Sequence, residues 1–257
     1  MTILKELWSR RSLIWSFAIS DLKIRYRNSV LGFFWTLLEP LLLMGVLYIV
    51  FTNIFKSQIE HFGLYLLVGI IMWNMFSRGT EMAMNSVLAK GGLLTHIYFP
   101  TEIPAISSVI TSSLMLFFEI IVFFIFMVIF QFVPPLTIVF LPLVLALEIL
   151  FVLGISLPLS VLNVKYRDVQ FIWKVILQAG FFITPVFYKL DVLPSNIQNI
   201  LKYSPMVQII TMAHNLSLYN MLPSLESVEI AIFTTLIVFT IGYFIFHKCQ
   251  KRVIEEL

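Results

Sequence analysis

Long runs of apolar residues constrain the fold of this chain more than any other feature. A helix needs about 20 mainly apolar residues to cross about 30 Å of hydrocarbon. Six segments are of about this length, and they lie at 30–55, 62–84, 105–132, 136–162, 171–188 and 230–247. Because an open sheet edge leaves backbone groups without partners in lipid, helices are the expected structure. The sequence therefore predicts an all-α integral membrane protein with six transmembrane helices.

The composition agrees with this prediction. Hydrophobic residues make up 60% of the 257 residues and charged residues only 12%, whereas soluble proteins have about 45–50% apolar and about 25% charged residues. No linker rich in Gly, Ser or Pro divides the chain. We expect a single transmembrane domain over residues 1–257, with a cytoplasmic segment at 1–28, six spans within 30–247 and a cytoplasmic tail at 248–257.

The basic residues predict the orientation of the spans. If the N-terminus is cytoplasmic, only Lys56, Lys189 and Lys202 of the 17 Lys and Arg residues lie on the outer side. Cytoplasmic loops of membrane proteins carry an excess of basic residues. We therefore expect the N- and C-termini to be cytoplasmic.

Two segments outside the spans have patterns typical of membrane contact. In the first 28 residues, Ile14, Phe17, Ala18 and Leu22 share one side of a helix. This pattern predicts an N-terminal amphipathic interface helix in the inner headgroup layer, or else an ordinary basic flank. Between spans five and six, residues 189–229 combine three prolines with apolar patches. They predict outer re-entrant helices, which need protein or water around them at membrane depth.

The chain lacks the motifs of an enzyme. It has no G-x-x-x-x-G-K-[ST] phosphate loop, so we do not expect it to hydrolyse ATP. A single cysteine, Cys249, excludes an intramolecular disulfide and a cysteine zinc cluster, and the four histidines are scattered. We predict no catalytic residue, no metal site and no cofactor on this chain, and no nucleic-acid partner.

Ionisable residues within spans are costly and therefore informative. Glu119 and Glu148 lie near the middle of the third and fourth spans, which a short turn makes antiparallel neighbours. Each is either a polar contact along a substrate path or a protonated acid that hydrogen-bonds a hydroxyl such as that of Ser112, Ser113 or Ser156. Arg78 and Glu81 lie three residues apart on the second span, and we expect them to pair.

Aromatic residues make up 15% of the chain. Sugar rings present apolar faces that stack on aromatic rings, so an aromatic-lined channel would suit a glycan. The alternative is the interfacial aromatic belt of membrane proteins. The candidate channel residues are Trp35, Tyr48, Phe51, Trp73, Phe181, Phe182, Phe187 and Tyr188.

Several segments together resemble a known family: the type-two permeases of ATP-binding-cassette transporters that export O-antigen, capsule and teichoic-acid polymers. The matching segments are DLKIRYR at 21–27 with Trp35 and Pro40, residues 85–104, NVKYRDV at 163–169, and TPVFY at 184–188 with Pro194 and Ser204-Pro205. Many family members have Asn where Ser204 stands.

The resemblance implies how the chain functions. It implies a homodimer with the conduit between the subunits, and two copies of a separate ATPase subunit that binds ATP and Mg. It also implies a lipid-linked glycan as substrate, surrounding membrane lipid and a place in the cytoplasmic (inner) membrane. Two other functions stay open: a permease that exports a drug or simple lipid, and an integral membrane enzyme acting on lipid-linked sugars. An enzyme of that kind requires a convergent set of acidic, basic or metal-binding residues, and the sequence does not supply such a set.

Two inner loops are the expected contacts with the ATPase. The first, at 86–100, mixes apolar and basic residues, which suits a short helix that docks in a groove. The second, at 163–169, places charged residues at the inner surface, where an arginine can grip a carboxylate. The alternative is that both are ordinary basic loops of the cytoplasmic side. The candidate coupling residues are Leu88, Lys90, Leu94, His96, Phe99, Tyr166, Arg167 and Asp168.

Overall fold

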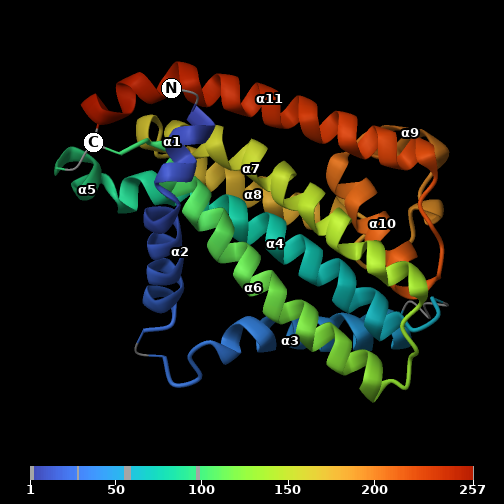
Figure 1. Ribbon diagram of the computed structural model, residues 1–257. Coiled ribbons are helices and arrows are strands. Elements are labelled where there is room, and N and C mark those ends of the chain that lie inside the picture. The colour runs from blue at the N-terminus through green and yellow to red at the C-terminus, as the bar shows by residue number, and fades with distance from the viewer. Residues whose placement is uncertain (1–2, 28, 55–58, 97–98, 257) are drawn as a thin grey trace.

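The computed structural model describes residues 3–27, 29–54, 59–96 and 99–256, and within these ranges every regular element is a helix (Figure 1). Among the described residues, five helices are long and apolar enough to cross a membrane. They are α3 (Phe34–Asn53), α4 (Phe62–Ala89), α6 (Glu102–Ile129), α7 (Leu141–Lys165) and α11 (Leu225–Glu256). The prediction of an all-helical membrane protein is thus confirmed for the described residues.

The predicted fifth span is shorter than the sequence indicated. It corresponds to α8 (Val169–Ile183), an apolar helix of 15 residues. The helix ends where Thr184 adopts an extended backbone with ψ 140°. Thr184 precedes Pro185, and a residue before proline is disfavoured in the helical conformation. Residues 184–188, which we had placed in the span, therefore lie beyond its end.

Helix α4 is the centre of the bundle. Of its most hydrophobic 18-residue stretch, 89% is buried, against 11% for α3 and 17% for α11. It contacts α3, α6, α7 and α8. The outer helices consequently leave broad apolar faces exposed, as expected for helices that meet lipid.

Helices α7 and α11 approach each other closely through glycine. A Cβ atom built on Gly242 would collide with the carbonyl oxygen of Gly154, and one on Gly154 would lie 2.8 Å from the Cα atom of Phe239. Small residues at such crossings allow close backbone packing in membrane proteins.

The N-terminal helices α1 (Ile3–Ser9) and α2 (Arg11–Arg25) differ in direction from the bundle, because α2 runs crosswise to α4 and α6 (Figure 1). On α2, Ile14 and Ala18 are buried, and the Thr111 hydroxyl of α6 donates to the Ala18 carbonyl at 3.1 Å. The apolar side predicted from the sequence is therefore the side that packs. Gly32, with φ of +53°, lies in the turn that leads into α3.

The two ends of the bundle carry different short helices. One end holds α2, α5 (Gly91–His96) and the turn at 166–168, and we call it the inner end. The opposite, outer end holds η1 (Leu136–Phe140), η2 (Leu190–Val192), α9 (Ser195–Leu201) and α10 (Pro205–Leu218). The segment between α8 and α11 thus forms short helices, as predicted, and α10 packs against α4, α7 and α11.

Candidate functional site

A buried ion pair joins the second and third predicted spans. The Arg78 guanidinium on α4 donates to the Glu119 carboxylate on α6 at 2.8 Å, with side chains 7% and 0% exposed. The predicted pairing of Arg78 with Glu81 is therefore wrong. Glu119 is thus paired with a cation from a neighbouring helix, and not with a hydroxyl as one of its two predicted alternatives required.

Glu148 on α7 differs from Glu119. It is fully buried, and neither carboxylate oxygen has a hydrogen-bond partner within the described part of the chain. The second oxygen of Glu119 is likewise without one there. The hydroxyls expected to serve these acids do not do so: Ser112 and Ser113 donate to backbone carbonyls, and the Ser156 hydroxyl has no hydrogen-bond partner within the described residues. An ionised Glu148 would be very costly here, so a neutral acid is the form this environment favours.

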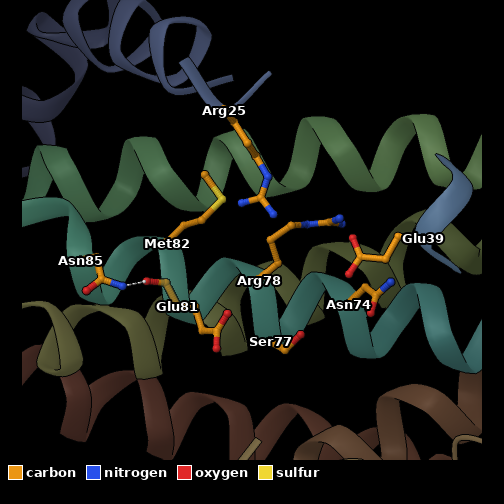
Figure 2. A pocket seen from close by; sticks show the side chains of 8 residues that line it. All are labelled: Arg25, Glu39, Asn74, Ser77, Arg78, Glu81, Met82 and Asn85. Atoms are coloured by element: carbon orange, nitrogen blue, oxygen red, sulfur yellow. Dashed lines mark hydrogen bonds between the residues drawn. The ribbon is translucent and has the colours of Figure 1, made fainter. Parts of the chain in front are cut away.

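A polar cavity opens beside the ion pair, and we call it the inner groove. Its volume is about 360 Å³. It is lined by Arg25, Glu39, Asn74, Ser77, Arg78, Glu81, Met82 and Asn85. Most of these come from α4, whereas Arg25 reaches in from α2 and Glu39 from α3 (Figure 2).

The groove places charge where apolar residues are the rule. Arg78 is buried, whereas Arg25 and Glu39 are exposed. Polar residues within spans face a bundle interior or a water-filled cavity, and they mark functional sites by default. The groove residues are not among the site residues predicted from the sequence, although the sequence carries a signal for them. Asn74, Ser77 and Glu81 recur at helical spacing in an otherwise apolar span.

Most of the predicted channel aromatics form a continuous set of ring contacts. Phe187 contacts Phe51, Phe181 and Phe182 with centroids 4.9, 5.7 and 6.0 Å apart. Phe181 in turn contacts Trp73 at 6.0 Å. Tyr188 contacts Phe187 at 5.2 Å.

The members of this aromatic set differ in exposure. Trp73 and Phe187 are buried, whereas Phe182 is 59% exposed. Tyr48 is connected to this aromatic set through Phe62, and the centroids of the Tyr48 and Phe62 rings are 6.1 Å apart. Trp35, at 47% exposure, has no ring contact recorded among the described residues.

The segment after α8 is held against α4 at Gly69. A Cβ atom at that position would collide with the Val186 carbonyl oxygen. The Tyr65 hydroxyl donates to the Tyr188 carbonyl at 2.8 Å. These contacts fix Phe187 and Tyr188 beside the outer half of α4.

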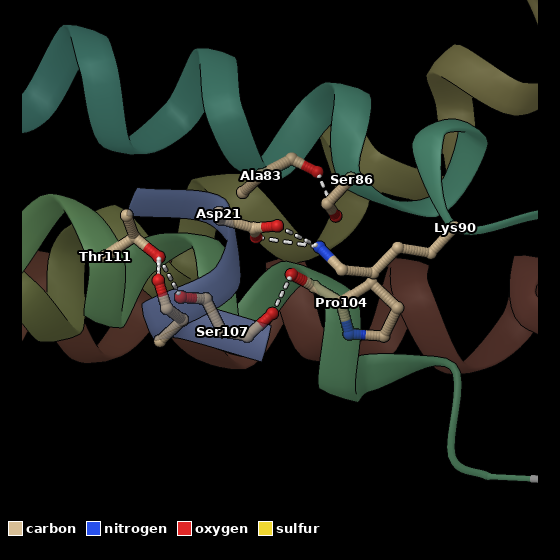
Figure 3. Close-up of polar contacts among 8 residues, drawn as sticks. Asp21, Ala83, Ser86, Lys90, Pro104, Ser107 and Thr111 are labelled. Atoms are coloured by element: carbon tan, nitrogen blue, oxygen red, sulfur yellow. Dashed lines mark hydrogen bonds and ion pairs between the residues drawn. The ribbon is translucent and has the colours of Figure 1, made fainter. Parts of the chain in front are cut away.

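The first inner loop is tied to the interface helix. The Lys90 ammonium, just after α4, binds both carboxylate oxygens of Asp21 on α2, at 2.7 and 3.0 Å (Figure 3). It also lies 5.2 Å above the Phe17 ring, and Phe17 packs edge-on against Phe99 at 5.7 Å. Two of the predicted coupling residues therefore contact α2 of their own chain.

The remaining coupling candidates of the first loop are placed only in part. Leu88 is half-buried, and His96 is exposed with its ring Nδ1 2.7 Å from the Gly92 carbonyl. The side chain of Leu94 lies outside the described residues.

The second inner loop presents its side chains to solvent. Tyr166, Arg167 and Asp168 are all exposed. The loop is held by Asn163, whose amide donates to the Met84 carbonyl at 3.3 Å and to Asn85 at 3.1 Å. The ends of α4 and α7 are thus joined directly beneath both loops, a contact that no local sequence pattern indicates.

A buried histidine anchors the outer end. The His214 ring stacks on Tyr65 at 3.7 Å, and its Nε2 lies 3.0 Å from the Tyr65 carbonyl. Burial lowers the pKa of His214 to about 3, although this hydrogen bond acts to raise the pKa. The neutral imidazole therefore donates its proton to the carbonyl at physiological pH.

Comparison with known proteins identifies the class of the chain. Residues 12–218 match the family described as ABC-2 type transporter, and the chain belongs to this family.

Among its relatives is the O-antigen export system permease protein RfbA of Klebsiella pneumoniae, which is 28% identical over 238 residues and covers 92% of each chain. RfbA of Myxococcus xanthus is 27% identical over 257 residues, 99% of each chain. The polysialic acid transport protein KpsM of Escherichia coli is 22% identical over 247 residues, 93% of each chain.

Proposed function

We propose that this chain is the membrane-spanning subunit of an ATP-driven exporter of lipid-linked polysaccharide. The observation that carries the proposal is the near full-length similarity to permeases for O-antigen and polysialic acid export. The given sequence contains no G-x-x-x-x-G-K-[ST] phosphate loop. We therefore assign ATP and Mg binding to a separate ATPase subunit.

The working assembly is a homodimer with two copies of that ATPase in the cytoplasmic membrane. In this arrangement α8 is the fifth of six spans and α11 the sixth, and the inner end faces the cytoplasm. The exposed faces of α3 and α8 support a polar conduit between two copies. Glu39 is exposed on α3, and Lys174 and Gln178 are exposed one turn apart on α8. Charged side chains are expensive against lipid, so a polar surface opposite them is favoured.

The conduit combines the inner groove with the aromatic set. The groove opens near the inner end, and the ring contacts from Trp73 to Phe187 and Tyr188 continue toward the outer end. Glu119 acts there by holding Arg78, whereas Glu148 has a packing role.

The inner loops transmit the motion of the ATPase. Tyr166, Arg167 and Asp168 are exposed for contact with the ATPase, and the first loop passes displacement to α2 through Lys90 and Asp21. Changing Arg167→Ala or Asp168→Ala is expected to abolish export at normal abundance. ATP hydrolysis should weaken or no longer respond to substrate. Wild-type export from both variants would exclude a coupling role for this loop.

Purification separates this function from the enzyme alternative. The chain alone is expected neither to hydrolyse ATP nor to consume a lipid-linked sugar. The same preparation should support ATP hydrolysis once the partner ATPase is added. Turnover of nucleotide or of a lipid-linked sugar by the chain alone would contradict the proposal.

A further inference from the structure

The inner groove contains polar groups that the chain itself does not satisfy. The side-chain amide nitrogen of Asn74 and the Nε of Arg78 are buried and have no hydrogen-bond partner within the described residues. By contrast, the Asn85 amide donates to the Glu81 carbonyl at 2.9 Å. Buried polar groups nearly always have partners. The two unsatisfied donors therefore indicate that water or a ligand completes the groove.

The charges of the groove restrict what that ligand is. Two guanidinium groups, Arg25 and Arg78, face two carboxylates, Glu39 and Glu81, so the formal charge of the lining is zero. Arg78 also has its own counterion in Glu119. A phosphate or diphosphate is normally held by converging donors and excess positive charge. Here it would meet two carboxylates.

The groove instead alternates donors and acceptors. Guanidinium groups only donate, carboxylates only accept, and the amide and hydroxyl groups do both, so together they match sugar hydroxyls that donate and accept at once. The volume of about 360 Å³ falls within the range of small-molecule sites, roughly 300–1,000 Å³. Trp73, adjacent in sequence to Asn74, is in ring contact with Phe181 of the aromatic set, on which we expect sugar rings to stack.

We propose that the inner groove binds the hydroxyl-rich sugar units of the transported glycan, and not the phosphate of its lipid carrier. The inference rests on the proposed export function and assigns a part of the substrate to a defined set of side chains. Arg25, Glu39, Asn74, Ser77 and Glu81 supply the hydrogen bonds, and Arg78 is held in position by Glu119.

Thiol protection tests this assignment. Met82 lines the groove without being assigned a hydrogen bond to the sugar, and Cys249 is the only cysteine in the sequence, so Met82→Cys in a Cys249→Ser background gives one reporter thiol. The purified full-length chain with its partner ATPase is treated with a small thiol reagent. The probes are maltohexaose and inorganic pyrophosphate at equal ionic strength. We expect maltohexaose to slow the modification severalfold and pyrophosphate to leave it unchanged. Protection by pyrophosphate, or by neither probe, would overturn the assignment.

Matched variants define the specificity. The exposed Ser224→Cys reporter at the outer end should not be protected by either probe. Combined Glu39→Gln and Glu81→Gln changes leave the two arginines in excess. This variant should gain protection by pyrophosphate, which shows that the assay detects an anion when the charge permits it.

A further pair separates binding from folding. Asn74→Leu should weaken protection by maltohexaose, whereas Asn53→Leu should not, because the Asn53 amide is exposed and bonds within α3. Equal thermal midpoints for the two variants exclude misfolding as the cause of their different protection. Surface polysaccharide in cells lacking the chain tests the export function separately. If surface polysaccharide is lost in these cells but maltohexaose does not protect the groove thiol, the export function stands and only the sugar site is overturned.

Discussion

The ion pair between Arg78 and Glu119 makes a specific prediction about stability. Both side chains are almost completely buried and 2.8 Å apart. Removing one partner of a buried pair costs about 3–5 kcal/mol, because the other charge is left uncompensated. Glu119→Gln keeps a hydrogen-bond acceptor but removes the negative charge. We expect this variant to lose about 3 kcal/mol, near the lower end of that range.

The two halves of the pair should not be equivalent. Arginine stays charged throughout the accessible pH range, so Glu119→Gln leaves a buried cation that cannot be neutralised. Arg78→Met leaves a carboxyl group that can take up a proton instead. The Glu119→Gln variant should therefore be the less stable one. For a chain of this length about 1 kcal/mol corresponds to about 2–4 °C, so the thermal midpoint should fall by on the order of 10 °C.

Thermal unfolding of the purified protein in detergent measures these differences. Glu148→Gln is the matched control, since Glu148 is equally buried but has no cation partner among the described residues. It should unfold within a few degrees of the parent. The double variant Arg78→Met with Glu119→Leu should recover most of the lost stability, because apolar replacements of buried pairs are often neutral. Equal midpoints for Glu119→Gln and Glu148→Gln would refute this reasoning.

Three further predictions concern other contacts. Asp21→Lys or Lys90→Asp alone should lower export severalfold at normal abundance, and the two together should restore part of it; export that stays normal in both single variants would exclude coupling through α2. Gly242→Val should lower the free energy of unfolding by at least about 1–3 kcal/mol, because it overpacks the α7–α11 crossing. Gly45→Ala should be tolerated, because no atom lies within 4 Å of the new Cβ. An unchanged thermal midpoint for Gly242→Val would contradict the close approach of the two helices. The pKa of His214 is lowered to about 3 from its usual 6.5, so the unfolded chain binds the proton more readily and the free energy of unfolding should fall as the pH is lowered from 6.5 towards 3. His214→Gln should reduce that slope in a pH series of thermal midpoints, and an unaltered slope would argue against the histidine as its source.

The sequence predicted the local features well because hydropathy is a local property. The apolar runs gave four of the long spans within a few residues and also the position of α11, which extends beyond the predicted span at both ends. The spacing of Ile14 and Ala18 gave the packed side of α2. The early end of α8 is predictable in principle from Pro185, but the apolar run through residue 188 favours a longer helix.

The tertiary contacts of the site were not accessible in this way. Arg78 and Glu119 are 41 positions apart, and Asp21 and Lys90 are 69 apart. A single sequence favours partners within a helical turn, so Arg78 was matched with Glu81. The polar residues Asn74, Ser77 and Glu81 at helical spacing on α4 are visible in the sequence. Their function as one wall of a groove depends on Arg25 and Glu39, which only the fold brings together.

Inverted membrane vesicles test the central claim most directly. Vesicles that contain the chain, its partner ATPase and the lipid-linked glycan expose their cytoplasmic face to the medium. ATP should make the glycan inaccessible to a glycosidase added outside, and vesicles without the chain should show no such change. If the glycan stays accessible while ATP is hydrolysed by the assembled complex, the chain does not export it.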